Sequence, residues 1–254
     1  MITVFESIRD WQKLRASSNF GFRTLGFVPT MGALHDGHLS LVRRSKEEND
    51  RTLVSIFVNP TQFDDSNDFK NYPKTLHEDL KMLEDVGVDY VLLPNEKEIY
   101  QDKYRFQVLE TEVSQILCGK FRPGHFQGVL TVVLKLLNVA DSHRAYFGEK
   151  DFQQYLLIRE MAEAFFIKTQ IVGAPTIREA DGLAMSSRNR RLSSEERVLA
   201  KEFPRILMES PSTTLATEKL KKLGFSVDYV EEQWGRRLAA IRLGEVRLID
   251  NVKI

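Results

Sequence analysis

Short runs of β-branched and aromatic residues alternate with helical patterns along the first two thirds of the chain. The runs are too short and too continuous for amphipathic helices, so they predict buried strands. They are LGFVPT (25–30), LVSIFVNP (53–60), DYVLLP (89–94), RAYFG (144–148) and TQIVGAPTI (169–177). Because parallel neighbours need helical crossovers, the alternation predicts an α/β fold: a Rossmann-like parallel sheet with helices on both faces. A ligand site is expected at the carboxyl ends of these strands.

The segments between the predicted strands have helical spacing. Helices are expected at 38–49, 74–87, 128–140 and 151–166. In the second of these, Thr75 and Glu78 predict a capping box, and Gly87 predicts the end of the helix.

The C-terminal third of the chain has a different pattern. We expect a helix at 193–208 opened by a Ser193–Glu196 capping box, a basic helix near 216–223, and strands at 225–232 and 244–250. Residues 1–176 are therefore expected to form the Rossmann-like domain. Residues 177–254 are expected to form a small α+β C-terminal domain. Because its core is small, we expect it to depend on packing against the first domain for stability.

Composition narrows the class of protein. The 36 basic and 36 acidic side chains balance, which disfavours broad, non-specific binding of nucleic acid or membranes. A single cysteine, Cys118, excludes an internal disulfide framework and fits a reducing compartment. No apolar run approaches 18 residues, and the first ten residues contain no apolar signal core. We therefore expect a soluble cytoplasmic protein.

The segment PTMGALHDGHLSL (29–41) begins at the end of the predicted strand 25–30 and contains His35 and His38. Gly32 and Gly37 permit close backbone approach, and a helix start offers free N–H groups to an anion. Histidines in that position favour phosphate contact. A zinc site would need further ligands, and the one cysteine is remote. The alternative is a pair of histidines that cap the helix without another function.

Three more segments contain groups suited to a polar ligand. Asn59 and Gln62 follow a strand in FVNPTQF (57–63), Lys150 follows another in YFGEKDFQQ (146–154), and DGLAMSSRNRRLS (181–193) is rich in hydroxyl and guanidinium donors. Each has a structural alternative: a polar turn, a helix cap at Asp151, or a solvated basic loop. Gln153 and Gln154 point about 100° apart on a helix, so only one is expected to face a cleft. Together, the segments favour an anion site.

These residues resemble a known family. HDGH (35–38) matches the H-x-G-H signature of the nucleotidyltransferase superfamily, and MSSR (185–188) resembles its second motif. Four longer blocks resemble the pantothenate synthetase (pantoate–β-alanine ligase) family, in order, between about residues 25 and 197. They are PTMGALHDGHLSL, NPTQF, RPGHFQGVLTVVLKLLN with FGEKDFQQ, and PTIREADGLAMSSRN.

The resemblance implies an ATP-dependent ligase that joins pantoate to β-alanine through a pantoyl-adenylate, with release of pyrophosphate and AMP. It implies a nucleotide- and pantoate-binding domain, a C-terminal lid domain, Mg²⁺ held mainly by the phosphates with Asp79 nearby, and a homodimer. The implied ATP-binding residues are Met31, Gly32, Ala33, Leu34, His35, Asp36, Gly37, His38, Gly148, Glu149, Lys150, Asp151, Ile177, Met185, Ser186, Ser187 and Arg188.

Roles follow residue by residue. His38 occupies the place of the family's proton donor, and His35 and Lys150 are further donors for developing phosphate charge. Gln62 and Gln154 match the glutamines that hold pantoate, and Gln62 also lies near the β-alanine position. The alternatives are another cytidylyl- or adenylyltransferase of the superfamily, an aminoacyl-tRNA synthetase relative, which the small size and zero net charge disfavour, and a non-catalytic nucleotide-binding regulator.

Overall fold

The computed structural model describes residues 2–17, 23–64 and 66–254. The chain divides into two compact units, Met1–Gly148 with Gln153–Ala174, and Glu149–Phe152 with Pro175–Ile254. We call them the sheet unit and the C-terminal unit. The division falls two residues before the expected boundary at 176. It also assigns the segment Glu149–Phe152, which lies between a strand and a helix of the sheet unit, to the C-terminal unit.

The sheet unit contains the predicted Rossmann-like parallel sheet. Its six strands are β1 (Thr3–Phe5), β2 (Leu25–Thr30), β3 (Arg51–Ile56), β4 (Tyr90–Leu92), β5 (Arg144–Gly148) and β6 (Gln170–Ala174). They lie in the order β1-β4-β3-β2-β5-β6, and every pair is parallel. From β2 the chain moves outward through β3 and β4, then returns to the other side at β5. The order therefore reverses between β2 and β5, where doubly wound sheets open a crevice.

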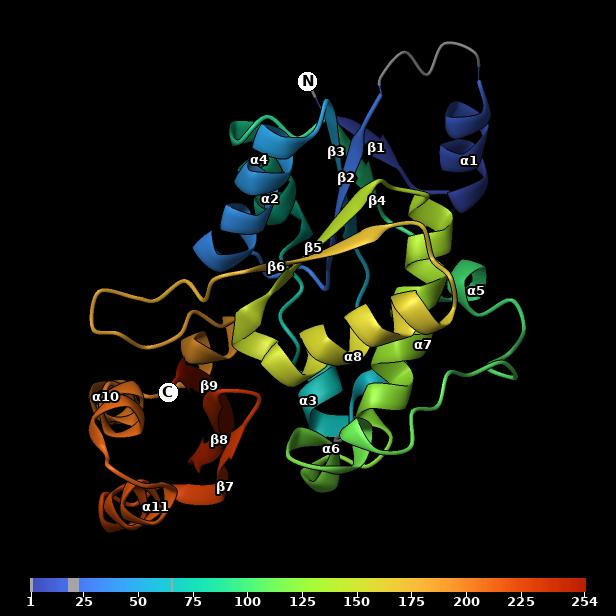
Figure 1. The fold of residues 1–254 in the computed structure, drawn as a ribbon. Coiled ribbons are helices and arrows are strands. Elements are labelled where there is room, and N and C mark those ends of the chain that lie inside the picture. Colours follow the sequence, from blue (N-terminus) through green and yellow to red (C-terminus); the bar gives the residue numbers. More distant parts are fainter. Residues whose placement is uncertain (1, 18–22, 65) are drawn as a thin grey trace. The chain divides into compact units, whose positions relative to one another are not determined.

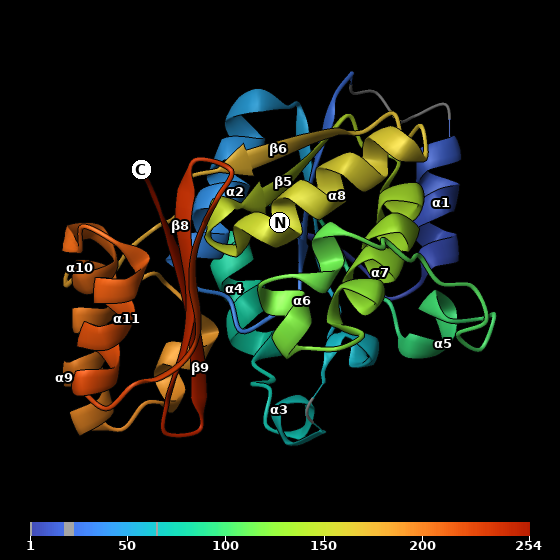
Figure 2. The same ribbon diagram turned by 60° about the horizontal axis from the view of Figure 1, so that its bottom comes forward.

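Helices cover both faces of this sheet (Figures 1 and 2). α2 (Asp36–Glu48) and α4 (Leu76–Asp85) lie on one face, and α1 (Ile8–Ala16), α7 (His125–Ala140) and α8 (Phe152–Ala164) on the other. Right-handed crossovers require this split, because the two halves of the sheet are wound in opposite directions. Shorter elements are η1 (Pro60–Gln62), α3 (Ser66–Lys70), α5 (Glu96–Ile99), η2 (Val113–Gln115), α6 (Cys118–Phe121) and η3 (Glu149–Asp151).

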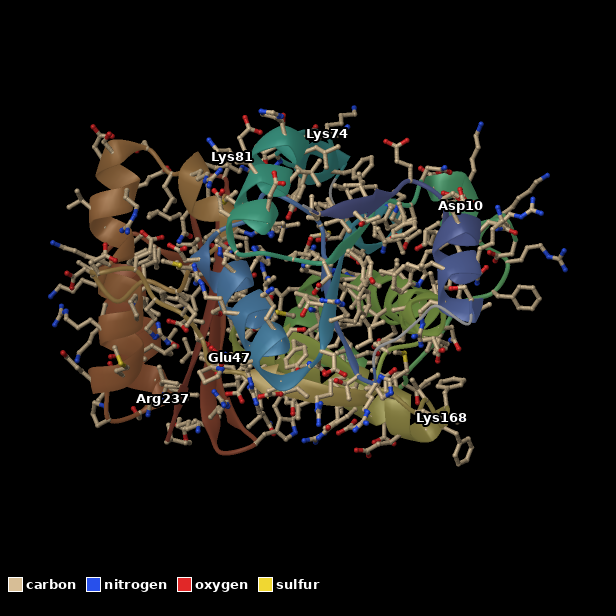
Figure 3. The ribbon with its side chains drawn as sticks, turned by 90° about the horizontal axis from the view of Figure 1, so that it is seen from above. Asp10, Glu47, Lys74, Lys81, Lys168 and Arg237 are labelled. Atoms are coloured by element: carbon tan, nitrogen blue, oxygen red, sulfur yellow. The ribbon has the colours of Figure 1, made fainter. Side chains whose placement is uncertain are left out.

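Apolar side chains fill the space between helix and sheet. On the α2–α4 face the buried cluster includes Val28, Leu34, Val42, Val54 and Leu83. Charged side chains of the sheet unit, such as Asp10, Glu47, Lys74, Lys81 and Lys168, are exposed (Figure 3). Among the described residues no helix has both the length and the hydropathy to cross a membrane.

Two predicted strands of the sheet unit end early, β3 at Ile56 and not at residue 60, and β6 at Ala174 and not at residue 177. The capping box predicted at the start of α4 was also wrong. Thr75 precedes α4, but its side chain makes no capping hydrogen bond to the helix backbone. Its hydroxyl instead donates to Asp79 Oδ1 at 3.2 Å, so a buried carboxylate competes for the group that the capping box needs. The helix end at Gly87 is confirmed, with a left-handed φ of 72° and a hydrogen bond from its N–H to Glu84 O.

The C-terminal unit packs helices against an antiparallel sheet. Its strands are β7 (Ser226–Gln233), β8 (Arg236–Leu243) and β9 (Val246–Lys253), in the order β7-β8-β9, and its helices are η4 (Ser187–Arg191), α9 (Ser194–Ala200), α10 (Glu202–Glu209) and α11 (Thr213–Lys222). Phe203, Leu207, Leu220 and Ile241 are among the buried residues that join helices and sheet.

In the C-terminal unit one capping prediction is confirmed, one predicted helix is divided into two, and one strand was missed. The Ser193–Glu196 capping box is present at the start of α9. The expected single helix at 193–208 is two helices, since Lys201 ends α9 and begins α10. Strand β8 was not expected, because RRLAAIRL lacks polar alternation; it is the central strand and is buried along most of its length.

Candidate active site

The turn between β2 and α2 has an unusual backbone. Gly32 and Ala33 both have left-handed φ angles, 77° and 49°. For a residue with a Cβ this conformation costs on the order of 1–2 kcal/mol, so the surroundings must enforce it. The buried carboxylate of Asp79, on α4, accepts hydrogen bonds from Ala33 N at 2.9 Å and Leu34 N at 2.8 Å. Asp79 therefore holds the turn in shape.

His35 and His38 stand where α2 begins. His35 is the N-cap residue, and its Nδ1 accepts a hydrogen bond from Gly37 N at 3.1 Å. The proton of the neutral ring then lies on Nε2, which makes that atom a donor. The ring of His38 lies one helical turn away, with its centroid 4.1 Å from that of His35. Two imidazoles at the positive end of a 13-residue helix form a site suited to an anion.

Not every predicted residue of this segment can contact a ligand with its side chain. Ala33 and Leu34 are 1% exposed, and their N–H groups are already bonded to Asp79. Asp36, in contrast, is exposed at the first turn of α2. The sequence motif therefore contains both presented groups and groups that build the turn.

Gln62 lies beside this turn. Its Nε2 is 3.1 Å from Met31 Sδ, and its Oε1 accepts from Asn59 Nδ2 at 3.0 Å. The structure thus brings Gln62 together with Met31 of the histidine segment. Its main-chain oxygen also accepts a hydrogen bond from His125 Nδ1 at 2.7 Å. His125 comes from α7, whose role here sequence reasoning missed, although it lies in the RPGHFQG block.

Gly128 lets α7 pack directly on the short helix that ends in Gln62. A Cβ at this position would lie 2.4 Å from Thr61 O and 2.7 Å from Gln62 N. We expect Gly128→Ala to displace Gln62 and to lower the free energy of unfolding by about 1–3 kcal/mol, as overpacking does. Denaturant unfolding measures the loss.

The matched control for this prediction is Gly124→Ala. Gly124 precedes α7 with a φ of 80°, but a Cβ there meets no atom within 4 Å. Gly124→Ala therefore measures the cost of the left-handed backbone conformation alone, without a steric clash of the new Cβ. An unfolding free energy for Gly128→Ala no lower than that of Gly124→Ala would contradict the packing argument.

The two adjacent glutamines of α8 differ, as expected of neighbours on a helix. Gln153 is 4% exposed; its Nε2 donates to Val113 O at 2.7 Å and Ile116 O at 2.8 Å, and its Oε1 accepts from Cys118 N. Its amide is therefore committed to fixing the 113–118 segment. Gln154 is half-buried, and its side-chain amide makes no hydrogen bond with another residue of the described chain, so this amide is available for a ligand.

In the C-terminal unit, Glu149, Lys150 and Asp151 form the turn η3. Lys150 Nζ lies 3.6 Å from Asp151 Oδ2, and its side chain is 19% exposed. The Glu149 carboxylate forms an ion pair with Arg236, so it is not free to act as a ligand-binding group of its own. Gly148, the first residue of the predicted GEKD motif, ends β5 in the sheet unit.

The loop that contains Met185–Arg188 is held at its base. Met185 N donates to Ile177 O at 3.0 Å, which places the two predicted residues side by side. Ser186 caps η4, its hydroxyl accepting from Arg188 N at 3.3 Å, and Ser187 is buried. Asn189 donates to Glu179 Oε1 at 2.6 Å and to Ala184 O at 3.1 Å.

Behind this loop, Arg197 donates to both Glu179 and Asp181 at 2.5 Å. The hydrogen bond from Arg197 keeps the pKa of Asp181 below its usual range. Asp181 therefore remains ionised at neutral pH, and the two ion pairs of Arg197 connect the loop to α9.

The side chains of the described residues do not fit a resident metal site. Among them no group of three or more histidine, cysteine, aspartate or glutamate side chains could hold a metal ion. Asp79, the predicted neighbour of Mg²⁺, is 1% exposed, and both its carboxylate oxygens accept backbone hydrogen bonds. Its geometry gives it the structural role described above. Its contact with Mg²⁺ stays a prediction that these hydrogen bonds do not favour.

Comparison with known proteins places these motifs in context. Residues 2–253 match the family model described as Pantoate-beta-alanine ligase. The chain belongs to this family. The pantothenate synthetase of Legionella pneumophila (strain Lens) is 49% identical over 248 residues, which cover 98% of each chain.

Solved structures of the pantoate-beta-alanine ligase family agree with the fold. A crystal structure of the Francisella tularensis pantoate-beta-alanine ligase, complexed with beta-gamma ATP and beta-alanine, matches with a TM-score of 0.94. It is 41% identical and covers 100% of this chain and 98% of its own. The pantothenate synthetase of Thermus thermophilus matches with a TM-score of 0.91 at 36% identity, covering 99% of each chain. The family, the ligase class and the Rossmann-like fold that the sequence predicted are confirmed.

Proposed function

We propose that this chain condenses (R)-pantoate with β-alanine to pantothenate, with ATP as the activating substrate. Membership of the pantoate-beta-alanine ligase family supports this reaction. The structural observation that carries the proposal lies in the sheet unit, at the carboxyl ends of β2 and β3. There a histidine pair at a helix start adjoins the turn that contains Met31, which contacts the amide of Gln62. The histidine pair suits the phosphates of ATP, and the neutral amide beside it suits the hydroxyl and carboxylate groups of a hydroxy acid.

In the first half-reaction the pantoate carboxylate attacks the α-phosphorus of ATP. A bond forms between the carboxylate oxygen and phosphorus, the bond to the bridging oxygen breaks, and pyrophosphate leaves with the electron pair. Negative charge grows on the phosphoryl and leaving oxygens. The Nε2–H donor of His35 and the ring of His38 stabilise that charge as preorganised groups at the start of α2.

The C-terminal unit contributes a second set of donors in this proposal. Lys150 acts as a point charge, and Ser186, Ser187 and Arg188 provide hydroxyl, backbone and guanidinium groups for the phosphates. Ile177 and Met185 contribute apolar surface to the nucleotide. Mg²⁺ belongs to the substrate as MgATP and neutralises phosphate charge, so the protein needs no metal cage of its own.

In the second half-reaction the amine of β-alanine attacks the acyl carbon of pantoyl-adenylate. An amide bond forms, the acyl C–O bond to the phosphate breaks, AMP leaves with the electron pair, and the nitrogen loses a proton. Both steps require alignment of reactants more than a protein nucleophile. Gln62 and Gln154 hold pantoate through their amides, and Gln62 also lies near the incoming β-alanine.

The reaction is tested by following AMP. We expect AMP to form only when ATP, pantoate and β-alanine are all present. AMP or a nucleotide adduct formed with a phosphorylated acceptor alone would favour another nucleotidyltransferase. ATP binding without turnover at saturating substrates would favour a regulator.

Gln62→Ala is expected to weaken pantoate use selectively. A neutral hydrogen bond is worth about 0.5–1.5 kcal/mol, so the loss of one such bond to pantoate should raise KM for pantoate roughly 2- to 13-fold. KM for ATP should change less than twofold. Initial rates at varied pantoate and varied ATP measure the two effects, and Gln233→Ala, an exposed glutamine at the end of β7, is the matched control. Equal changes in both KM values would remove Gln62 from the pantoate site.

The homodimer and the cytoplasmic location are further parts of this proposal. The resemblance to the family supports the dimer, and the single buried cysteine supports a reducing compartment. Light scattering of the purified chain at several concentrations determines the oligomeric state, and a mass of one chain at all concentrations would refute the dimer.

A further inference from the structure

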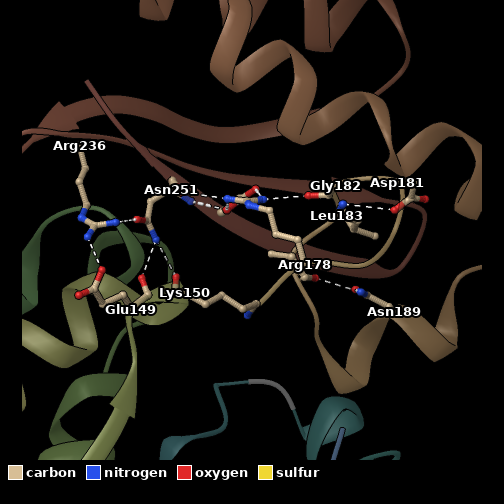
Figure 4. A network of polar contacts seen from close by, with 11 residues as sticks. Glu149, Lys150, Arg178, Asp181, Gly182, Leu183, Asn189, Arg236 and Asn251 are labelled. Carbon is tan, nitrogen blue, oxygen red and sulfur yellow. Dashed lines mark hydrogen bonds and ion pairs between the residues drawn. The ribbon is translucent and has the colours of Figure 1, made fainter. Parts of the chain in front are cut away.

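Two adjacent residues near the end of β9 reach two different segments of the C-terminal unit (Figure 4). Asp250 and Asn251 are each 3% exposed. Successive side chains of a strand point to opposite faces, so one strand can hold an element on each side. β9 is also the edge of its sheet, where such contacts are sterically possible.

Asn251 holds the turn that contains Lys150. Its Nδ2 donates to Glu149 O at 2.8 Å and to Lys150 O at 3.0 Å. Its Oδ1 accepts from Arg236 Nη1 at 2.7 Å, which determines the orientation of the amide. Arg236 also pairs with the Glu149 carboxylate and lies 4.0 Å from the ring of Phe152. Asn251 therefore holds the main chain of the turn, and Arg236 contacts the side chains of Glu149 and Phe152 on either side of Lys150.

Asp250 holds the base of the other segment. Its carboxylate accepts two parallel hydrogen bonds from Arg178, at 2.7 and 2.9 Å. Arg178 also donates to Gly182 O at 2.9 Å, and its backbone pairs with Ala184 in an isolated bridge. The residues directly after Ala184 are Met185–Arg188. The Arg178–Asp250 ion pair therefore holds the residues that directly precede the loop with the two serines.

We propose that Asp250 and Asn251 are positioning residues. They fix Lys150 and the Ser186–Arg188 loop relative to each other by holding both segments on β9. This inference rests on the proposed function, in which both segments bind the phosphates of ATP. Neither Asp250 nor Asn251 is itself assigned a contact with substrate. Donors that must meet a phosphate together need mutual alignment, and an error of about 1 Å can cost roughly 100-fold in rate.

The decisive variant is Asn251→Asp. It keeps the oxygen that faces Arg236 and replaces the amide nitrogen, so the two carbonyls of the turn face a carboxylate oxygen instead of a donor. We expect faster hydrogen exchange at amides 149–152, and a rise of about 10- to 100-fold in KM for ATP or a fall of that size in kcat. KM for pantoate, which depends on residues of the sheet unit, should stay within twofold.

Asp228→Asn is the matched control on the same sheet. Asp228 on β7 accepts a hydrogen bond from Arg247 at 2.7 Å, so this variant also breaks an ion pair of the sheet. We expect it to lower the melting temperature and to leave exchange at 149–152 and KM for ATP unchanged. If Asp228→Asn changes ATP use as much as Asn251→Asp does, the effect is general destabilisation and the proposal is overturned.

Asp250→Asn tests the second half of the inference. It should speed exchange at residues 182–188 and leave residues 149–152 protected, whereas Asn251→Asp should do the reverse. Equal loosening of both segments by both variants would show a general loss of β9 structure and overturn the separate roles. Unchanged exchange at both segments would overturn the inference as well.

Lys150→Ala separates this inference from the proposed function. If Asn251 acts on ATP through Lys150, the double variant Asn251→Asp/Lys150→Ala should be little worse than Lys150→Ala alone, because coupled residues are not additive. Full additivity would overturn the positioning role. Normal ATP use by Lys150→Ala would instead refute the assignment of Lys150 in the proposed function, while the exchange experiment still decides what holds the turn.

Discussion

His38→Ala should lower kcat about 100- to 1000-fold, while the chain remains folded. The loss corresponds to roughly 3–4 kcal/mol of transition-state stabilisation, the value typical of one preorganised donor at developing oxyanion charge. His38 lies in the first turn of α2, with its ring centroid 4.1 Å from that of His35, so its removal takes away a donor without opening the core. Steady-state formation of AMP measures the effect.

His77→Ala is the control for His38→Ala. His77 is an exposed histidine on α4, and we expect its removal to leave both turnover and stability unchanged. Thermal unfolding of His38→Ala should match that of the unaltered protein. Turnover of His38→Ala within a few-fold of normal would remove His38 from the mechanism.

Asp79→Asn should impair both stability and turnover. The carboxylate receives two backbone N–H groups in a buried site, and an amide can offer an oxygen to only one of them. Leaving one buried N–H unsatisfied costs about 1–3 kcal/mol, and the left-handed backbone at Ala33 then loses its restraint. We expect the free energy of unfolding to fall by about 2 kcal/mol. Turnover should fall because the turn that leads to the histidines shifts.

The same variant distinguishes a structural role of Asp79 from a role in binding Mg²⁺. Denaturant unfolding without Mg²⁺ should already reveal the loss of stability, and added Mg²⁺ should not restore turnover. Glu78→Gln, its exposed neighbour on α4, should have neither effect. Normal stability of Asp79→Asn together with rescue by high Mg²⁺ would return Asp79 to the metal site.

Local pattern was sufficient for many elements of this fold. β2 and β5 lie at the predicted residues, because continuous apolar runs bounded by turn residues define a strand through nearest neighbours alone. β8 was missed because burial on both faces removes the polar alternation that marks a strand. The capping box at Thr75 failed for a different reason: a side chain four residues away took the hydroxyl.

In the candidate site, too, the contiguous motifs were predictable from the sequence and the contacts between distant residues were not. The HDGH, GEKD and MSSR segments are short and contiguous, so their chemistry is visible without a fold. Asn251 lies 101 residues from Lys150, His125 lies 63 from Gln62, and Arg178 lies 72 from Asp250. No spacing in the sequence connects residues so far apart, and each looks like an ordinary polar residue within a strand, loop or helix end.

The sequence by itself determined the strand–helix alternation, the family and the segments that contain the reactive groups, because these depend on neighbouring residues. Tertiary structure decided how those segments are held. It gave Asp79 two backbone donors, committed Gln153 to a loop while leaving Gln154 available, and joined the turn of Lys150 to β9. Such assignments arise from packing between distant parts of the chain, where a buried polar group must take whatever partner the fold brings to it.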